Sequence, residues 1–170
     1  DTPEPLARVL MRAMAKDRRI ETVLGDYGYD AERRRTQGVA GGVSKRYIWA
    51  GQSVAAEVAG GSAVSRYDSG TDLIRSDLAG EGERWYGRDA MGTTTSLTSS
   101  TGALAARAEY DAWGERIAET GVTANRVGFT GYREDAETGL DYAINRYYSP
   151  DTGRFTTHDP LTELDRPERL

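Results

Sequence analysis

The side chains that most often do chemistry in proteins are scarce in this sequence. Cysteine is absent, which excludes a disulfide, a cysteine-ligated zinc ion and a thiol nucleophile. His158 is the single histidine. A metal site would need two or three acidic partners around it, and a serine-type triad would need it between a serine and an aspartate. A turn residue is the better interpretation of His158, and we predict neither a metal nor a cofactor.

Arginine supplies nearly all of the positive charge. Of the 22 basic residues only Lys16 and Lys45 are lysine, which leaves 20 arginines (22 minus 2). A guanidinium group can fork to a carboxylate and can stack on a tyrosine ring, and the chain has 10 tyrosines. The excess of arginine over lysine can be explained by arginine-mediated contacts or by a compositional bias of the genome, and the sequence leaves both explanations open.

Several function classes are disfavoured by the overall pattern. The net charge is -5 and no long block of like charges occurs, so general binding to nucleic acid is not expected. Stretches such as "SSTG" and "AGGS" are turns rather than phosphate cradles, because no GxGxxG or Walker motif is present. No apolar run is long enough for a transmembrane helix, and residues 1–25 do not form a proper signal peptide. Because the initiator Met is missing, we expect a piece of a longer protein.

The stretch "PLARVLMRAMAKDRRI" has helical periodicity. Its apolar residues recur at i, i+3, i+4, i+7 and i+8, which places them on one face, and Thr2 and Pro3 supply a start. We predict a short helix over residues 4–16. Packing on the sheet formed by the rest of the chain is favoured over binding to a membrane surface or a partner. The apolar face consists of Leu6, Val9, Leu10, Ala13 and Met14.

From about residue 20 onward, short runs rich in Val, Ile, Tyr, Trp and Thr alternate with glycine-bearing turns. Examples are "SKRYIWAG", "SVAAEVAGG" and "TTTSLTSSTG". This spacing predicts antiparallel β-hairpins. The predicted fold class is therefore all-β, with one short N-terminal helix.

The dipeptide Tyr-Asp recurs at intervals of 38 and 43 residues (67 minus 29, 110 minus 67). About two strands and a glycine-rich turn fit into each interval, and self-similarity at this period predicts a repeat architecture. Each hairpin would bury its apolar face only by stacking on its neighbours. The three copies are Tyr29-Asp30, Tyr67-Asp68 and Tyr110-Asp111.

The chemistry of a turn explains why this dipeptide would recur. The tyrosine ring packs on the next unit, and the aspartate can accept hydrogen bonds from backbone amides two residues on. Gly70 and Gly114 follow the tyrosine by three or four positions and would supply a positive φ. Arg33 takes that place at the first copy, so we expect that turn to differ.

Residues 126–160 contain two similar turn motifs, "AETGL" and "PDTGR". Their glycines, Gly139 and Gly153, are 14 residues apart (153 minus 139). The stretch "LDYAINRYY" between them predicts a strand, and Pro150 and Gly153 would shape a turn into a following strand. The rings that this hairpin offers for packing are Tyr147, Tyr148 and Phe155.

The stretches "YDAWGERI" and "GFTGYREDAETGLDYAINRYYSPDTGRFTTHDPL" resemble the conserved core of Rhs and YD-repeat proteins. The resemblance is specific over residues 107–161 and looser over residues 20–106. The order of segments in that family divides this chain into four parts. They are an N-terminal segment (1–19), YD-type hairpin repeats (20–125), a plug segment (126–161) and a C-terminal tail (162–170).

The resemblance implies a fold and a role. Members of this family build a long antiparallel β-ribbon that spirals into a hollow shell, and the shell encloses a toxin domain from the C-terminal end of the same chain. Relatives include the C subunits of insecticidal toxin complexes and bacterial competition effectors. The implied partners are further YD-repeat segments, of this or another chain, and a C-terminal toxin domain. The implied location is secreted or at the surface of a bacterium. Open sheet edges lead us to expect association, including homo-oligomers.

In many members the plug segment also cuts the chain, in a manner like an aspartic protease. Such cleavage needs two carboxylates that share a proton and have unequal pKa values. The resemblance places one carboxylate at Asp159, and Asp135 is the closest candidate for the other. Arg146 and Arg154 could hold or screen these carboxylates.

Two departures from the family pattern argue against cleavage in this chain. Ser149 stands where relatives tend to carry an aspartate, and Thr162 stands where a glycine is expected after "DP". We therefore favour a structural part of the shell over a self-cleaving module, with the acidic and arginine side chains in solvated or structural ion pairs. A third hypothesis is an adhesive module whose exposed tyrosines and arginines bind glycans.

Overall fold

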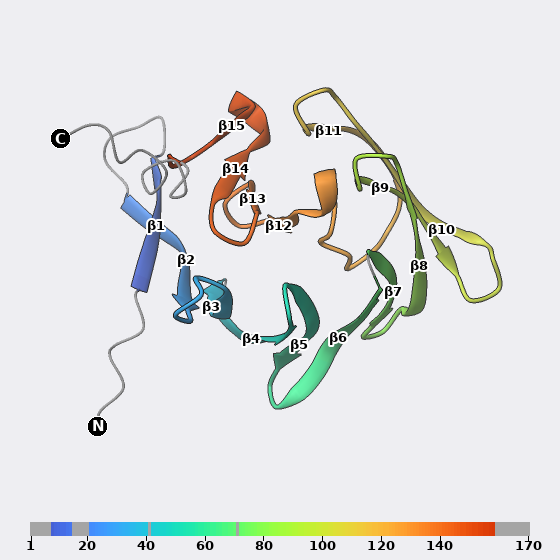
Figure 1. Cartoon of the computed structure of the whole chain (residues 1–170), viewed down its shortest axis with the longest axis horizontal. Helices are drawn as coiled ribbons and strands as arrows, with labels where there is room; N and C mark the ends of the chain where they lie inside the picture. Colours follow the sequence, from blue (N-terminus) through green and yellow to red (C-terminus); the bar gives the residue numbers. More distant parts are fainter. Residues whose placement is uncertain (1–7, 15–20, 41, 71, 159–170) are drawn as a thin grey trace, which may run out of the picture.

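The computed structural model describes residues 8–14, 21–40, 42–70 and 72–158. These residues form an eleven-stranded antiparallel sheet in which each strand pairs with its neighbours in the sequence. The sheet curves like an open ring, and a second, four-stranded sheet lies on its concave side (Figure 1). The strands of the large sheet are β1 (Arg8–Met14), β2 (Glu21–Tyr29), β3 (Arg35–Ala40), β4 (Val43–Ala50), β5 (Ser53–Ala59), β6 (Ser62–Ser69), β7 (Leu73–Leu78), β8 (Gly82–Arg88), β9 (Thr94–Ser99), β10 (Leu104–Tyr110) and β11 (Arg116–Gly121).

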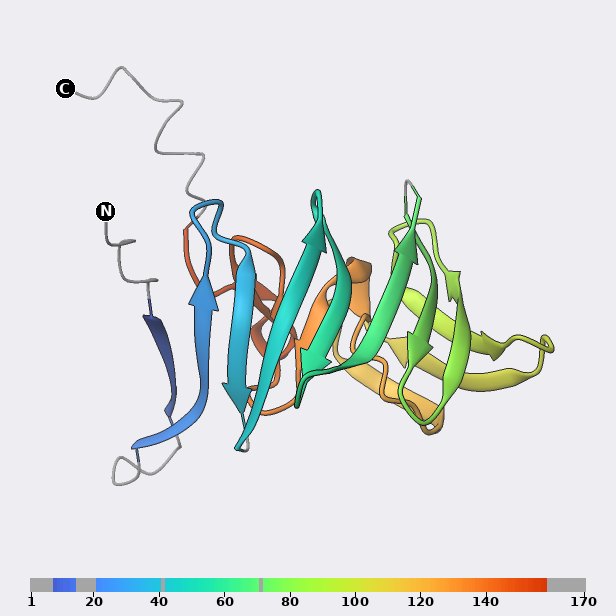
Figure 2. The ribbon, with the colours of Figure 1, turned by 90° about the horizontal axis from the view of Figure 1, so that it is seen from below.

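The large sheet is an uninterrupted series of hairpins, as the alternation of short runs and turns predicted. Figure 2 shows the strands side by side, with tight connections at both edges of the sheet. Glycines with positive φ close many of these connections, for example Gly51, Gly60 and Gly102. The prediction of an all-β, antiparallel hairpin fold is confirmed. No helix in the described part of the chain is long and apolar enough to cross a membrane.

The predicted N-terminal helix is wrong. Residues 8–14 form strand β1, which pairs with β2 from Arg8 opposite Gly28 to Met14 opposite Glu21. An isolated helix of this length is marginal in water, whereas β2 offers an open row of backbone donors and acceptors. Pairing therefore overrides the helical spacing of the apolar residues. The remaining parts of the predicted helix, residues 4–7 and 15–16, lie outside the described residues.

Repeated β-bulges account for the curvature of the sheet. Each even-numbered strand from β2 to β10 has a register shift one or two residues before its C-terminal end, at the same edge of the sheet. A bulge bends its strand and increases the local twist, so five bulges along one edge curve the whole ribbon in one direction. The shifts lie at Gly28/Tyr29, Ile48/Trp49, Asp68/Ser69, Gly87/Arg88 and Glu109/Tyr110.

The bulges also define the true repeat. One tyrosine stands directly before the bulge of each of β2, β4, β6 and β8, namely Tyr27, Tyr47, Tyr67 and Tyr86. These tyrosines are 20, 20 and 19 residues apart (47 minus 27, 67 minus 47, 86 minus 67). The repeat is therefore a single two-stranded hairpin. The prediction of about two strands between Tyr-Asp copies is wrong, because three complete strands, β3 to β5, and the first part of β6 lie between the first two copies.

The second Tyr-Asp copy is not equivalent to the other two. Tyr67 corresponds to Tyr27, two residues before the tyrosine of the first copy, and Asp68 pairs with Arg75 instead of capping a turn. The equivalent turn aspartate in the next hairpin is Asp89, which follows an arginine. Its Oδ1 accepts hydrogen bonds from the amides of residues 91 and 93 at 2.9 and 2.8 Å.

The turn chemistry was predicted correctly for Asp111, whose Oδ1 accepts hydrogen bonds from the amides of residues 113 and 115 at 2.8 and 2.9 Å. Gly114 has the expected positive φ of 90°, but Gly70 does not adopt a positive φ. Arg33 was expected to change its turn, and this is wrong. Its φ is 62°, and the backbone hydrogen bonds of Asp30 repeat those of Asp111.

We predict that replacing Gly114 by Ala destabilises the chain more than replacing Gly102 by Ala. Both glycines have positive φ, of 90° and 81°, so the strained backbone of an alanine at either position lowers the stability by about 1–2 kcal/mol. A Cβ at Gly114 would lie 2.4 Å from the Phe129 ring, whereas a Cβ at Gly102 would have no atom of the described residues within 4 Å. Overpacking should cost a further ~1–3 kcal/mol at Gly114 only. Urea unfolding measures the free energy of unfolding of both variants. Equal losses of stability in the two variants would contradict the packing of this turn on Phe129.

Candidate functional site

The concave face of the large sheet is covered by the C-terminal part of the described chain, which we call the inner segment (residues 126–158). Its short strands form the second sheet in the order of the sequence. They are β12 (Arg133–Asp135), β13 (Leu140–Tyr142), β14 (Tyr147–Ser149) and β15 (Arg154–Phe155), with 3₁₀ turns η1 (Phe129–Gly131) and η2 (Pro150–Thr152).

The local structure of the inner segment follows its turn residues. The stretch "LDYAINRYY" was predicted as one strand, and this is wrong, because it forms β13 and β14 joined by a tight turn in which Ile144 has a φ of 61°. The predicted hairpin around Pro150 and Gly153 is confirmed. Gly153 has a φ of 63°, and β14 pairs with β15 through Tyr148 opposite Phe155.

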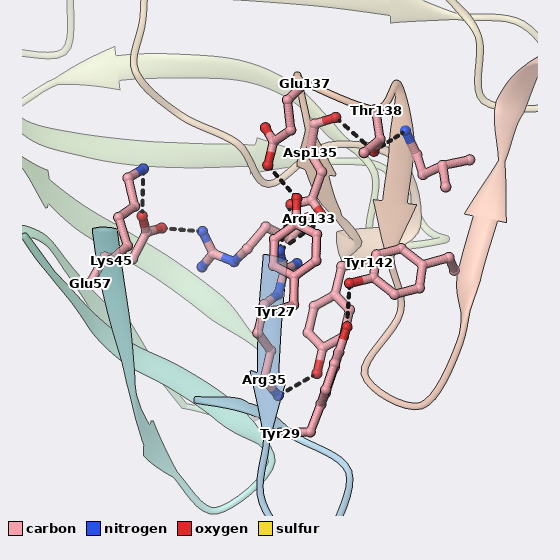
Figure 3. A network of polar contacts seen from close by, with 12 residues as sticks. Tyr27, Tyr29, Arg35, Lys45, Glu57, Arg133, Asp135, Glu137, Thr138 and Tyr142 are labelled. Carbon is pink, nitrogen blue, oxygen red and sulfur yellow. Dashed lines mark hydrogen bonds and ion pairs between the residues drawn. The ribbon is translucent and has the colours of Figure 1, made fainter. Parts of the chain in front are cut away.

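A buried arginine lies at the centre of the contact between the sheet and the inner segment. Arg35, the first residue of β3, has no exposed surface. Its Nη1 donates hydrogen bonds to both carboxylate oxygens of Asp135 on β12, at 2.8 and 2.9 Å (Figure 3). Burial opposes the charge of Arg35, but Asp135, Tyr47 and Tyr147 together outweigh burial and raise the pKa of the guanidinium. Burial raises the pKa of the Asp135 carboxyl, and Arg35 limits that rise.

Tyrosine rings from both layers surround this guanidinium. Its central carbon lies 4.1 Å from the ring centroid of Tyr142 and 4.6 Å from that of Tyr27. Cation–π contacts of this kind are stronger when water is excluded. These contacts compensate the guanidinium, whose Nε and Nη2 have no hydrogen-bond partner among the described residues. The other rings around Arg35 belong to Tyr47 and Tyr147.

The tyrosine hydroxyls tie the first hairpin to the inner segment. The hydroxyl of Tyr29 lies 2.6 Å from that of Tyr147, and the Tyr27 hydroxyl donates to Glu137. The amide of Arg35 donates to the Tyr142 hydroxyl at 2.7 Å. Burial raises the pKa of Tyr142 to about 12, so this phenol stays neutral at physiological pH.

A second buried network joins the middle of the sheet to β12. Glu57 on β5 is only 4% exposed, and it accepts hydrogen bonds from Arg133, from the Tyr67 hydroxyl at 2.9 Å and from Lys45 at 3.2 Å. Burial opposes the ionised form of Glu57, but Arg133 and Lys45 hold the pKa of Glu57 below its usual value. Glu57 therefore stays charged and anchors the inner segment.

Two further hairpins contact the inner segment or the residue that precedes it. The Tyr86 hydroxyl of β8 donates to the side chain of Asn125 at 2.7 Å, and Arg116 of β11 donates to Glu134 at 2.6 Å. The amide of Thr94 donates to the Gly128 carbonyl at 3.1 Å. The concave face is thus bound to the inner segment along nearly its whole length.

Of the two carboxylates that were predicted to cut the chain, the structure describes only one. Asp135 is 5% exposed and bonded to Arg35, whereas Asp159 lies outside the described residues. The central carbon of Arg146 lies 3.6 Å from the ring centroid of Phe155, and Arg154 begins β15. The pairing of Asp135 with Asp159 therefore stays a prediction.

Sequence reasoning missed the residues that carry the contact, namely Arg35, Glu57 and Arg133. Arg35 follows two other arginines, and no local pattern distinguishes it from them. Glu57 gave a usable signal, because it is the single charge in the apolar strand "SVAAEVA". A lone charge in such a strand indicates a buried partner. No group of three or more His, Asp or Glu side chains that could hold a metal ion occurs among the described residues.

Comparisons with known proteins agree on one architecture. The family model described as "Teneurin YD-shell" matches residues 9–169. The tRNA nuclease WapA of Bacillus subtilis strain 168 is 34% identical over 148 residues, which cover 79% of this chain and 6% of that protein. The double-stranded DNA deaminase toxin A of Burkholderia cenocepacia is 38% identical over 78 residues, 43% of this chain and 6% of that protein.

Solved structures give the same fold. The crystal structure of TcdB2-TccC3-Cdc42 superposes with a TM-score of 0.65 at 17% identity, over 80% of this chain and 8% of that chain. The crystal structure of TcdB2-TccC3-TEV has a TM-score of 0.65 over 93% of this chain and 9% of that chain. This chain spans less than a tenth of the length of each of these relatives.

We predict that replacing Asp135 by Asn lowers the free energy of unfolding by about 3–5 kcal/mol, because Arg35 would keep a buried charge without its partner. Replacing Asp77 by Asn is the matched control. Asp77 pairs with Arg66 at 3.7 Å between two exposed side chains, and losing such a pair should change stability by at most ~1 kcal/mol. Chemical unfolding followed by tryptophan fluorescence compares the two, and similar losses would show that the buried pair does not hold the layers together.

Proposed function

The chain belongs to the YD-shell family, and from this membership we propose that it is the C-terminal part of a shell that encloses a toxin domain of the same polypeptide. The observation that carries the proposal is the inner segment on the concave face of the sheet. It follows the last strand of the large sheet in the sequence, and its last described strand, β15, lies on the concave side (Figure 1).

The open edges of the sheet support the need for further shell segments. Within the described residues, β1 and β11 each pair with one neighbour only. Unpaired strand edges associate with other strands, so we expect further YD repeats of the same polypeptide, or of another chain, to continue the sheet. The isolated chain would self-associate through the same edges. A shell of this kind belongs to a secreted or delivered bacterial protein.

The relatives favour enclosure over any single enzymatic activity. One is named as a tRNA nuclease and another as a DNA deaminase toxin, yet both contain a segment like this one. A segment shared by toxins with different chemistry is better explained by a common container than by either reaction. Adhesion through exposed tyrosines receives little support, because Tyr27 and Tyr67 on the sheet and Tyr142 and Tyr147 on the inner segment are all buried.

Limited proteolysis of the full-length protein tests the enclosure. We expect a domain C-terminal to this segment to resist protease while the shell is intact, and to become sensitive when Asp135→Asn loosens the inner segment. The Asp77→Asn variant should protect the domain as the wild type does. A downstream domain that is cut equally fast in wild type and Asp135→Asn would contradict enclosure.

A second candidate function is cleavage of the chain by Asp159 with Asp135. The favouring observation is that Asp135 is a deeply buried carboxyl whose pKa is raised by burial, and a carboxyl with a raised pKa can serve as the acid of such a pair. Intact mass of a form extended beyond Leu170 tests it. The wild type should yield two fragments and Asp159→Asn should stay whole, and an uncut wild type would eliminate the activity.

A further inference from the structure

A cavity of about 240 Å³ lies outside both buried networks, between the end of the large sheet and the inner segment. The rings of Tyr110 and Phe129 form part of its wall, and Gly114, Gly128 and Gly139 leave room beside them. The lining of the cavity contains four carboxylates and one guanidinium, so negative charge exceeds positive charge there. These charged residues are Glu115, Arg116, Glu134, Asp141 and Asp151.

Asp141 is the unusual member of this lining. It is 6% exposed, and no described residue donates a hydrogen bond to its carboxylate or forms an ion pair with it. Arg116 does not compensate Asp141 directly, because its Nη atoms bond Glu134 at 2.6 Å and Glu119 at 3.0 Å. Glu134 stands opposite Asp141 in the β12–β13 register, so the two carboxylates repel each other.

A buried carboxylate without a partner is costly, and a cation in the cavity would remove that cost. The described residues do not gather three metal-ligating side chains at any point, which argues against a metal ion. Aromatic walls beside carboxylates suit an organic cation, because the ring faces attract it and the carboxylates accept its hydrogen bonds. We propose that this cavity binds the cationic side chain of an arginine or lysine on another polypeptide segment.

The proposal has a pH signature. Burial first, and then the charge of Glu134, raise the pKa of Asp141 to about 7, and Arg116 opposes them only in part. A bound cation favours the ionised carboxylate, so binding should release a proton and strengthen as pH rises through 7. The charged and titratable groups around Asp141 are Tyr110 on β10, Glu115 in the turn before β11, Arg116 on β11, Glu134 and Asp135 on β12, Tyr148 on β14 and Asp151 on η2.

Carboxyl-detected NMR of the chain, titrated with N-acetyl-arginine amide or N-acetyl-lysine amide, tests the site. We expect saturable binding that lowers the pKa of Asp141. With a pKa of about 7, the ionised fraction and hence the affinity should be about 30-fold lower at pH 5.5 than at pH 8. The two probes show whether the flat guanidinium or the compact ammonium fits better, and either one supports the proposal.

Asp141→Asn should abolish binding while keeping the fold, because it removes a buried charge at constant shape. Asp77→Asn, on the opposite face, should bind as the wild type does. Binding that persists in Asp141→Asn, or saturation by calcium but by neither amide, would overturn the proposal. An Asp141 pKa that does not move when either amide is added at high concentration to the wild type would overturn it as well, independently of any variant.

Discussion

The buried ion pair between Arg35 and Asp135 is the constraint on which the rest of the structure depends. It joins residues 100 positions apart in the sequence, one on the large sheet and one on the inner segment. An unpaired charge at this depth would cost several kcal/mol, so the inner segment has one favourable position on the sheet. The surrounding tyrosine rings exclude water from the ion pair. The low dielectric strengthens the attraction between Arg35 and Asp135, and it also raises the free-energy cost of leaving either charge unpaired.

The same hairpin geometry produces the curved sheet and the polar lining that holds the inner segment. Each bulge bends the ribbon and follows a tyrosine in β2, β4, β6 and β8. The curvature therefore places a row of phenol groups on the concave side, where Tyr27, Tyr67 and Tyr86 bond the inner segment or its immediate neighbours. A concave face of this kind binds a polypeptide through specific polar contacts. It differs in this respect from an apolar core, which would accept many packings.

Local patterns predicted the hairpins and most turns, because those depend on glycine, proline and aspartate at short range. The repeat was harder to predict, since the visible Tyr-Asp dipeptide falls at two different positions of the hairpin, as Tyr67 and Tyr110 show. The helical spacing of residues 4–16 was overridden by strand pairing with β2. The partners of Glu57 and Arg35 come from residues 76 and 100 positions away. The lone charge of Glu57 indicates that it has a buried partner, but no local pattern identifies a partner so distant in the sequence.

The central claim is that the sheet and the inner segment form one cooperative unit. Native-state hydrogen exchange measures this most directly, because it gives the opening free energy of each backbone amide. We predict that the paired amides of β13 and β14 exchange with the same opening free energy as those of β2 and β3, and that both lose protection together in denaturant. Exchange of β13 and β14 through a separate, lower-energy opening, while β2 and β3 stay protected, would contradict the account.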